Sequence, residues 1–356
     1  MSDSTEKLTD LSALGEFGLI DALTKDLHTI HPATIVGVGD DAAVIQPETG
    51  KVMLVSKDLL IEGIHFDMVY MPLKHLGYKA AVVNISDIAA MNGTPKQMLV
   101  GLGVSSKYSA EAIQEIYVGI KKACEVYQVD LIGGDTTSSP AGLFLSLTII
   151  GEADPEKVVY RKGASPNDLL CVSGDLGAAY MGLLLLEREK SVFLADPNMQ
   201  PDLTDKEYLL ERQLKPEARM NILKILDDAG VKPTSMIDIS DGLASEAMHL
   251  CKASGTGCTI YEDKIPIDQL TFDTAKEFNI VPSVAALNGG EDYELLFTIK
   301  QSDFEKVKEL EGISIIGYMT DPDDGENLVT NDNQSIPLQA QGWDALKKRN
   351  MTTRKG

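Results

Sequence analysis

The sequence is poor in the side chains that build zinc sites and disulfide frameworks. It contains four cysteines, Cys124, Cys171, Cys251 and Cys258, and none of them forms a C-x-x-C pair or a zinc-finger spacing. Isolated cysteines of this kind are typical of buried free thiols in a reducing compartment. The five histidines are scattered along the chain, so a zinc centre is not expected.

Signals for membranes and for the commonest nucleotide-binding motifs are also missing. No apolar run approaches the ~20 residues that a membrane helix requires. Residues 1–6 are polar and acidic, without the apolar core of a secretory signal, so we expect a cytoplasmic protein that does not bind membranes. The sequence has neither a P-loop (G-x-x-x-x-G-K-[ST]) nor the H-R-D and D-F-G pair of protein kinases.

Positive charge is scarce as well. Against 54 acidic residues there are 32 lysines and arginines, so the formal net charge is −22. Such a surface disfavours unspecific binding of nucleic acid or anionic lipid. It would also repel an anionic substrate unless metal ions bridge that substrate to the protein. For most of these acids, solubility alone is an equally good explanation.

The length and the hydrophobic pattern predict two α/β domains. The 356 residues suffice for about two domains of ~100–200 residues. Apolar stretches of strand length alternate with longer amphipathic stretches in both halves, and no repeat relates the halves. We therefore expect a mixed α/β protein (α+β, with mixed sheets), divided into residues 1–157 and 158–356.

The expected elements follow from these patterns. In the first half we expect strands at 34–38, 42–46, 52–56, 97–104, 131–132 and 143–150, and helices at 72–86 and 110–127. The turn Pro47–Gly50 should join the second and third strands as a hairpin. In the second half we expect strands at 169–173, 235–239, 258–261, 293–299 and 313–318, and helices at 178–188, 216–229, 242–253 and 304–310.

Aspartates recur where the short apolar stretches end, and this pattern is the main functional signal. They are Asp40, Asp41, Asp58, Asp87, Asp135, Asp238 and Asp241. Taken alone, each is more simply explained as a helix cap or a turn residue. Taken together, they form an all-oxygen donor set of the kind that Mg²⁺ prefers, usually with substrate phosphates as further ligands. The recurrence favours several Mg²⁺ ions arranged along a polyphosphate.

Two short segments, one with two glycines and one rich in aspartate, are weaker signals. The stretch Gly174–Gly177 between a strand and a helix could cradle an anion, although a plain tight turn explains it better. Asp321–Gly325 looks like the start of a calcium loop, but its glycine is in the fifth place rather than the sixth. A turn is therefore the better interpretation there.

A series of short motifs, in order across residues 14–345, resembles those of thiamine-monophosphate kinases. The motifs are Val38-Gly39-Asp40-Asp41-Ala42-Ala43, Val55-Ser56-Lys57-Asp58, Glu62-Gly63-Ile64-His65-Phe66, Val83–Met91, Leu131–Thr137, Arg161-Lys162-Gly163, Ile237–Leu243 and Gly289–Leu295. The E-G-x-H-F and G-G-E-D-Y-E-L motifs separate this family from its relatives. Those relatives are aminoimidazole ribonucleotide synthetase, selenophosphate synthetase and a hydrogenase maturation protein.

The resemblance implies an activity and an assembly. The implied enzyme uses ATP and several Mg²⁺ ions to convert thiamine monophosphate to thiamine diphosphate, the last step of thiamine diphosphate biosynthesis. The implied N-terminal domain, residues 1–157, binds ATP and metal and pairs with its twin in a homodimer. The C-terminal domain, residues 158–356, closes over the active site. The two-domain architecture would be like that of aminoimidazole ribonucleotide synthetase.

The resemblance also assigns roles to individual positions. The implied metal-site residues are Asp41, Ser56, Asp58, Asp87, Asp135, Asp238 and Asp241. The implied ATP contacts are Tyr117, Gly134, Asp135, Arg161 and Ser240. The implied contacts to thiamine monophosphate are His65, Glu291 and Trp343. Trp343 could stack on a cationic ring for about 0.5–2 kcal/mol, or could simply anchor the C-terminal segment to the core. His65 could instead be a capped loop histidine.

One position departs from the family pattern, because Lys57 stands where the family usually has threonine. A lysine cannot ligate Mg²⁺ through its ammonium group. Either the backbone carbonyl serves there, or the ammonium replaces part of the charge of one ion. Lys57 is therefore left out of the predicted metal site.

The chemistry of the implied reaction suits these residues. A phosphate acceptor is already ionised near neutral pH, so no residue is expected to act as general base. The barrier lies in bringing two anions together in line. Two other functions remain open at this point. The chain could be another ATP-dependent synthetase of the same superfamily, or a non-catalytic cation or nucleotide-binding protein in which Lys57 marks a disabled metal site.

The adjacent acids Asp40 and Asp41 should contribute unequally. Successive side chains of a strand point to opposite faces, and the family motif matches Asp41 to the metal site. Replacing Asp41 with Asn should lower the rate of phosphoryl transfer on the order of 10²–10³-fold, whereas Asp40→Asn should have a much smaller effect. Steady-state kinetics of the two variants would check this, and equal losses would contradict the division.

Overall fold

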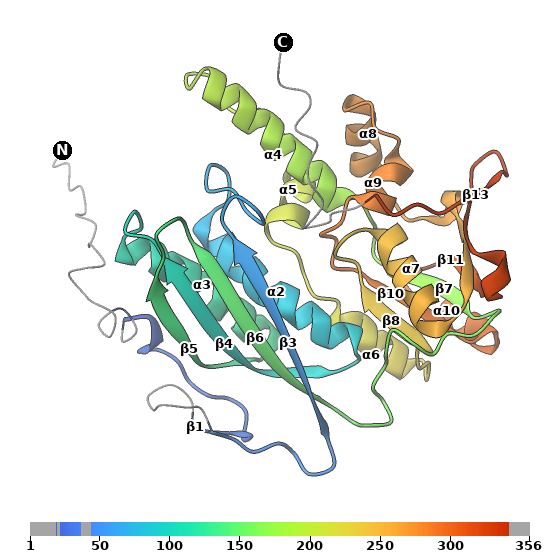
Figure 1. The fold of residues 1–356 in the computed structure, drawn as a ribbon, viewed down its shortest axis with the longest axis horizontal. Coiled ribbons are helices and arrows are strands. Elements are labelled where there is room, and N and C mark those ends of the chain that lie inside the picture. The colour runs from blue at the N-terminus through green and yellow to red at the C-terminus, as the bar shows by residue number, and fades with distance from the viewer. Residues whose placement is uncertain (1–18, 20–21, 37–43, 342–356) are drawn as a thin grey trace.

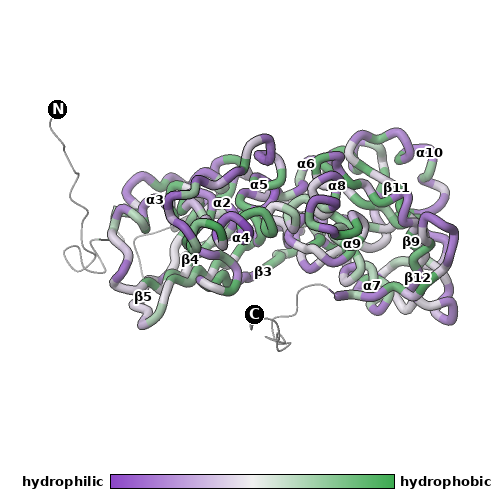
Figure 2. The backbone as a smooth tube through the Cα atoms, turned by 90° about the horizontal axis from the view of Figure 1, so that it is seen from above, coloured by the Kyte–Doolittle hydropathy of each residue, from purple (hydrophilic) through white to green (hydrophobic). Residues whose placement is uncertain are grey.

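The computed structural model describes residue 19 and residues 22–36 and 44–341. Two sheets lie side by side, a four-stranded one built from the first half of the chain and a seven-stranded one built from the second half (Figure 1). Seen from above, the elements of the two sheets occupy opposite ends of an elongated molecule (Figure 2). Asp40, Asp41 and Trp343 lie outside the described residues, so their predicted roles stay predictions.

The four-stranded sheet has the order β3-β6-β4-β5. Its strands are β3 (Val52–Ile61), β4 (Thr94–Val104), β5 (Asp130–Ser138) and β6 (Phe144–Ala153). β6 runs antiparallel to β3 and β4, while β4 and β5 are parallel. The expected hairpin around Pro47–Gly50 is wrong, because β2 (Val44–Ile45) pairs with β1 (Thr34–Val36) instead. All ten residues of β3 pair with β6, which offers a far longer ladder than β2 could.

Two helices cover one face of this sheet, α2 (Leu73–Ala90) and α3 (Ala110–Tyr127). The bounds of α3 are those predicted from the sequence. α2 continues past the expected end at residue 86, because the small and apolar side chains up to Ala90 are buried. It stops before Asn92, whose backbone is left-handed with φ of 57°. Asp87 therefore lies within the last turns of α2 rather than beyond its end.

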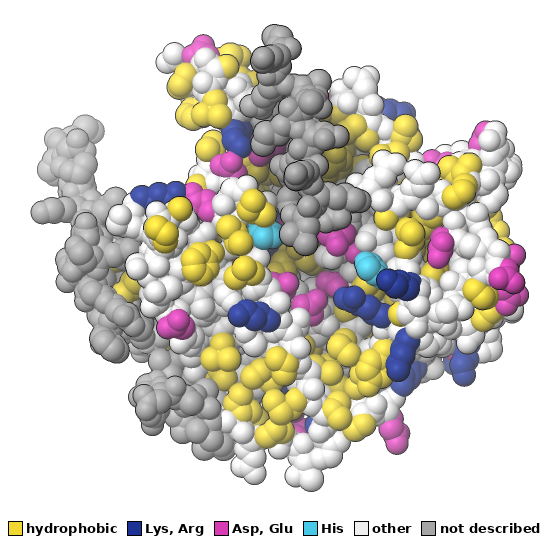
Figure 3. Space-filling model, in the orientation of Figure 1, with side chains coloured by type: hydrophobic (Ala, Val, Ile, Leu, Met, Phe, Trp, Pro, Cys, Tyr) yellow, Lys and Arg dark blue, Asp and Glu magenta, His cyan; other side chains and the backbone are white. Residues whose placement is uncertain are grey.

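No helix of the described residues covers the other face of the sheet, which we call the open face. Residues 54, 56, 58 and 60 of β3 face the helices, and the residues between them face outward. Val55 and Leu59 on this outer face are 64% and 46% exposed. Hydrophobic side chains gather over this part of the surface (Figure 3). An exposed apolar patch of this kind is typical of an interaction surface.

The seven-stranded sheet has the order β13-β12-β9-β11-β7-β10-β8. Its strands are β7 (Leu169–Ser173), β8 (Ser235–Asp238), β9 (Gly257–Tyr261), β10 (Leu295–Ile299), β11 (Ile313–Thr320), β12 (Glu326–Val329) and β13 (Ser335–Pro337). The helices of this half are α4 (Ala178–Ala195), α5 (Glu207–Leu214), α6 (Met220–Asp228), α7 (Leu243–Ser254), α8 (Gln269–Glu277), α9 (Pro282–Asn288) and α10 (Phe304–Val307). Parallel and antiparallel pairs occur in both sheets, which confirms the predicted mixed α/β class.

Several elements differ from the sequence prediction. The sequence did not predict α5, α8, α9, β12 or β13, which are all short. α4 runs to Ala195 instead of residue 188, and α6 begins four residues later than expected. β5 continues through Gly133-Gly134-Asp135, because parallel pairing with β4 holds even these poor strand formers extended. The segment Pro322–Asp324 forms a 3₁₀ turn, as predicted for that acidic stretch.

The predicted boundary between residues 157 and 158 stays a prediction, although the two sheets fall on either side of it. α2 lies where the two halves meet, since it contacts β3 and β6 as well as β8, α5 and α6. In the described part of the chain, no helix is both long and apolar enough to cross a lipid bilayer.

The close packing of α2 on α3 depends on Gly119. A Cβ atom at this position would lie 1.9 Å from the backbone oxygen of Lys74 in α2. We expect Gly119→Ala to lower the free energy of unfolding by about 1–3 kcal/mol, because the helices must move apart. Urea unfolding would measure this. The neighbouring Val118 is exposed, so Val118→Ala should change stability by less than ~0.5 kcal/mol. An equal effect of both changes would contradict the packing argument.

Candidate active site

A cavity of about 510 Å³ lies between the two halves of the molecule. β3, the end of α2, the segment 160–162 and β8 line it. Four predicted site residues are among its lining, Ser56, Asp87, Arg161 and Asp238. Much of the remaining wall is apolar. The structure thus brings predicted metal and ATP residues together from positions that are far apart in the sequence.

Hydrogen bonds at the end of α2 orient two acidic side chains of this cavity and tie the helix to β3 and β8. The hydroxyl of Ser56 in β3 donates to Oδ2 of Asp87 at 2.5 Å. One residue earlier in the helix, Ser86 donates to Oδ2 of Asp238 at 2.7 Å. Oδ1 of Asn84 accepts from the backbone N–H of Asp58 at 3.1 Å. The last turns of one helix therefore hold both β3 and β8 in place around the cavity.

The carboxylates crowd one another in surroundings poor in water. Burial, and after it the negative charge of Asp87, raises the pKa of Asp58 to about 6. Burial and the charge of Asp87 also raise the pKa of Asp238 to about 7. Burial raises the pKa of Asp87 too, although the Ser56 hydrogen bond and the charge of Arg161 oppose the shift. This accumulation of negative charge favours a bound cation.

These residues suit Mg²⁺ held jointly with a phosphate ligand. Among the described residues, no three His, Cys, Asp or Glu side chains are arranged so that they alone could hold a metal ion. Mg²⁺ usually takes only one or two carboxylates and completes its shell with water and substrate phosphates. Asp87 also lies near the C-terminal end of α2, where the helix dipole favours positive charge. The donor set is therefore compatible with the predicted Mg²⁺.

Other predicted residues lie away from this cluster. Asp135 in β5 is level with Leu59 in β3, through the paired residues Gly101 and Ser146 of the strands between them. Three strand spacings separate the two edges, roughly 14 Å, and Asp135 is on the open face of the sheet. In the single chain Asp135 is thus not brought together with Asp58, and its predicted metal role stays a prediction.

Gly134 and Tyr117 have plain structural explanations in the single chain. A Cβ atom at Gly134 would lie 1.9 Å from the backbone oxygen of Val100, so the β4–β5 pairing requires glycine there. Tyr117 is buried on α3, and burial raises the pKa of its hydroxyl to about 12. The predicted ATP contacts of both residues remain untested.

Lys57 lies on the sheet face opposite to Ser56 and Asp58. Its neighbours along β3 alternate between the helix side and the open side, and Lys57 is exposed on the open side. Its side chain therefore points away from the acidic cavity. This geometry agrees with leaving Lys57 out of the predicted metal site, and it explains why a lysine is tolerated in this motif.

A second polar cluster contains the predicted substrate residues His65 and Glu291. Nδ1 of His65 accepts a hydrogen bond from the backbone N–H of Ile61 at 3.0 Å. Burial lowers the pKa of His65, the charge of Glu291 raises it and that of Lys79 lowers it, so the three groups lie within electrostatic reach of one another. Lys79 donates to Glu291 Oε2 at 2.8 Å. The sequence analysis missed Lys79, although a lysine within the apolar run of α2 was a detectable signal.

The segment carrying Glu291 has an unusual backbone. Glu291 and Tyr293 both have left-handed conformations, with φ of 59° and 51°, which cost of order 1–3 kcal/mol each for such residues. Hydrogen bonds from Glu291 N to Ser240 O (2.7 Å) and from Tyr293 N to Ile239 O (2.9 Å) hold the segment in place. Retained strain of this kind is typical of functional sites.

Tyr293 connects the two polar clusters. It is 9% exposed. Burial and the negative charges of Glu291 and Asp238 raise the pKa of its hydroxyl well above the ordinary value. The ring therefore lies within electrostatic reach of both the acidic cavity and the His65 cluster. The predicted residues Ser240 and Asp241 lie two and three residues after the end of β8. The N–H of Asp241 donates to Glu246 Oε1 at 3.3 Å.

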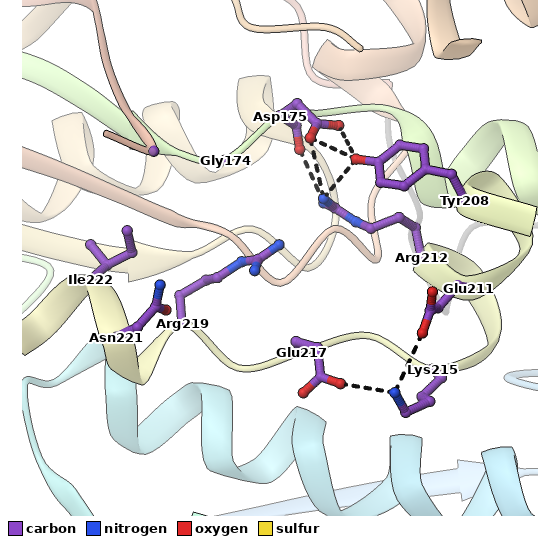
Figure 4. A pocket seen from close by; sticks show the side chains of 11 residues that line it. Gly174, Asp175, Tyr208, Glu211, Arg212, Lys215, Glu217, Arg219, Asn221 and Ile222 are labelled. Carbon is purple, nitrogen blue, oxygen red and sulfur yellow. Dashed lines mark hydrogen bonds and ion pairs between the residues drawn. The ribbon is translucent and has the colours of Figure 1, made fainter. Parts of the chain in front are cut away.

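A second cavity, of about 450 Å³, is lined by Arg212, Lys215 and Arg219 (Figure 4). Each of these cations is paired with carboxylates. Arg212 lies 3.1 Å from Glu294 and 3.5 Å from Asp175. Arg219 donates to Glu294 at 2.5 and 2.8 Å. Lys215 lies between Glu211 and Glu217, at 3.4 and 3.2 Å. This network anchors the strained segment around Tyr293 and leaves no cation of the three for an anionic ligand.

The stretch Gly174–Gly177 beside this cavity is a tight turn and not an anion cradle. The backbone N–H groups of Gly174 and Leu176 donate to the carbonyl groups of Gly312 and Pro266. The N–H of Gly177 donates to Asp292 Oδ2 at 2.9 Å. Since the chain itself uses these donors, the simpler of the two sequence interpretations holds.

The fold and the acidic cavity define the broad class of this protein. Residues 39–153 match the family model of AIR synthase related protein, N-terminal domain. The chain thus has the AIR synthase type of fold, with Ser56, Asp87, Arg161 and Asp238 placed around a cavity between two α/β halves.

More specifically, the chain is similar to thiamine-monophosphate kinases over most of its length. It is 34% identical to the enzyme of Bacillus subtilis (strain 168), over 94% of this chain and 100% of the relative. It is also 34% identical to that of Aquifex aeolicus (strain VF5), over 88% and 97%. The solved structure of AaThiL complexed with AMPPCP and TMP matches with a TM-score of 0.71 and 31% identity, covering 96% of this chain and 99% of that one. The chain belongs to the thiamine-monophosphate kinase family, which confirms the resemblance of its motifs.

The raised pKa of Asp238 predicts a pH-dependent stability of the metal-free protein. The unfolded carboxyl titrates near 4 and the folded one near 7. Between these values only the folded state holds the proton, so stability falls as the pH rises. Asp238→Asn should therefore be more stable than the unchanged protein at pH 8, on the order of 2–4 kcal/mol, and nearly equal at pH 4.

Chemical unfolding in the presence of a chelator, at several pH values, would measure this difference. Asp323 is an exposed turn residue, so Asp323→Asn serves as the matched control and should show no such trend. A stability difference between Asp238→Asn and the unchanged protein that does not vary with pH would contradict the burial argument.

Proposed function

We propose that this kinase transfers the terminal phosphoryl group of ATP to thiamine monophosphate, which yields thiamine diphosphate and ADP and completes thiamine diphosphate biosynthesis. The cavity that joins Ser56, Asp87, Asp238 and Arg161 is the observation that carries the proposal. The family membership supports the substrates, as does the related AaThiL structure, which contains AMPPCP and TMP.

The acidic cavity is the proposed site of the ATP phosphates. Arg161 supplies positive charge to them, and the apolar wall near Ile88 and Met236 suits a nucleoside. Asp58, Asp87 and Asp238 would hold Mg²⁺ together with the phosphates. Bound Mg²⁺ would supply charge neutralisation and would orient the polyphosphate. The hydrogen bonds from Ser56 and Ser86 keep two of these carboxylates oriented before substrate arrives.

The cluster around His65 and Glu291 is the proposed site of the acceptor. α2 runs from this cluster to the acidic cavity, and the eight residues from Lys79 to Asp87 span roughly 12 Å of helix. Direct in-line transfer requires the two phosphates to meet between these clusters. Catalysis would then rest on positioning and charge stabilisation, and the chain would provide no general base.

We also propose a homodimer formed through the open face of the four-stranded sheet. The exposed apolar side chains of β3, such as Val55 and Leu59, support this assembly. Pairing at this face would bury Asp135 as well. The domain division at residues 157 and 158, with the second domain closing over the active site, is part of the same proposal.

The proposal is tested by incubating the purified protein with Mg-ATP and thiamine monophosphate and measuring thiamine diphosphate by chromatography. We expect product from the unchanged protein. Asp58→Asn should lose on the order of 10²–10³ in rate at any Mg²⁺ concentration, because a carboxylate in the phosphate site is removed. Asp323→Asn, at an exposed turn residue of the second half, is the control and should leave the rate and the Mg²⁺ dependence unchanged. Lys57→Thr tests the face assigned to that residue, and it should leave the Mg²⁺ dependence unchanged because the side chain points away from the acidic cavity.

Absence of product with intact ATP binding would refute the proposed function. A large change of Mg²⁺ dependence in Lys57→Thr would instead contradict the face assigned to that residue.

A further inference from the structure

α2 carries a lysine where its neighbours are buried and apolar. The side chain of Lys79 is only 2% exposed. Its ammonium group donates to Oε2 of Glu291 at 2.8 Å and to the backbone oxygen of Gln213 at 2.8 Å. A charge this deeply buried is retained only with partners of this kind. The contact also joins the helix to two segments that lie more than 130 residues away in the sequence.

Gln213 adds a second donor to the same oxygen. Its side-chain Nε2 donates to Glu291 Oε2 at 2.7 Å, and the residue is 3% exposed. Gln213 lies in the last turn of α5, where backbone carbonyl groups lack partners within the helix. The ammonium of Lys79 satisfies this carbonyl. Lys79 and Gln213 therefore contact each other and both donate a hydrogen bond to Oε2 of Glu291.

The other carboxylate oxygen of Glu291, Oε1, accepts neither of these hydrogen bonds. Both side-chain hydrogen bonds that Glu291 accepts from the described residues end on Oε2. The Glu291 side chain is 30% exposed in its ion pair with Lys79, so part of the carboxylate can reach a ligand. The left-handed backbone and the hydrogen bond to Ser240 O prevent the residue from swinging away. The result is a carboxylate with one oxygen fixed and one available.

We propose that Lys79 and Gln213 are positioning residues for the acceptor, because by holding Oε2 they present Oε1 of Glu291 to the cationic ring system of the substrate. The inference rests on the proposed function. It assigns the two residues an indirect role, since neither needs to touch the substrate. His65, the predicted acceptor contact in the first half of the chain, lies within electrostatic reach of both Glu291 and Lys79.

The position of Lys79 on α2 gives this arrangement a second effect. Ser86 and Asp87 lie two turns further along the same helix. There Ser86 donates a hydrogen bond to Asp238, and Asp87 accepts one from Ser56 beside the acidic cavity. The rigid helix thus fixes the distance between the oxygen offered to the acceptor and the carboxylates offered to the ATP phosphates. Misplacement of one group by about 1 Å is enough to lower a transfer rate substantially.

The test measures steady-state kinetics of Lys79→Met and Gln213→Met with thiamine monophosphate and Mg-ATP. We expect the KM for thiamine monophosphate to rise about 10–50-fold in Lys79→Met, and less in Gln213→Met, which removes a neutral donor. The KM for ATP should change less than about threefold. Glu291→Gln should raise the same KM, and adding Lys79→Met to it should have little further effect, because residues that act through one group are not additive.

Tyr78→Phe is the matched control. Tyr78 is the adjacent residue of α2 and also ties the helix to the second half, since its hydroxyl donates to Glu217 at 2.7 Å. Loss of this tie should lower the melting temperature without changing the KM for thiamine monophosphate. If Lys79→Met does not fold, Gln213→Met decides the question.

Three outcomes would overturn the inference. An active protein whose KM for thiamine monophosphate is unchanged in the folded variants refutes the positioning role and leaves the proposed function intact. Additive effects of Lys79→Met and Glu291→Gln show that Lys79 does not act through Glu291. Failure of the unchanged protein to form thiamine diphosphate refutes the proposed function and this inference together.

Discussion

Repulsion among buried carboxylates is the constraint on which the rest of this structure depends. Asp58, Asp87 and Asp238 come from three separate elements and are held in one place, with raised pKa values as the consequence. Hydrogen bonds at the end of α2 hold the three residues in this arrangement: Ser56 of β3 donates to the Asp87 carboxylate, Ser86 donates to the Asp238 carboxylate, and the Asn84 side chain accepts from the backbone N–H of Asp58. The accumulated negative charge favours a bound cation, and the Mg²⁺ and polyphosphate proposed for this site would supply that compensation together.

The sequence predicted the class of fold and much of the acidic cavity, and the reasons are physical. Long amphipathic elements such as α3 have a period that is visible in the sequence, so even their bounds agree. Aspartates at the ends of apolar stretches predicted Asp87 and Asp238, because strand and helix ends gather at one edge of a layer. The pairing partner of β3 could not be predicted, since register depends on a strand that lies about 90 residues later in the chain. The hydrogen bond between Lys79 and Glu291 could not be predicted either, because the two residues are 212 positions apart in the sequence.

In the second half of the chain, ion pairs and backbone hydrogen bonds hold a segment whose backbone is strained. The left-handed residues Glu291 and Tyr293 would relax if nothing held them. Backbone hydrogen bonds to Ile239 and Ser240 hold one side of the segment. On the other side, Arg212 and Arg219 pair with Glu294. The ion pairs that line the second cavity thus hold the backbone segment that carries Glu291.

The alternation of β3 also limits how the length of this strand can change during evolution. Ser56 and Asp58 face the helices, whereas Lys57 faces the open side. A single inserted or deleted residue before this motif would invert the faces, so that Lys57 would enter the acidic cavity and Ser56 and Asp58 would leave it. Only changes by two residues, or a compensating bulge, preserve the site. The number of strand residues before Ser56 can therefore change only by an even number if Ser56 and Asp58 are to stay on the side of the acidic cavity.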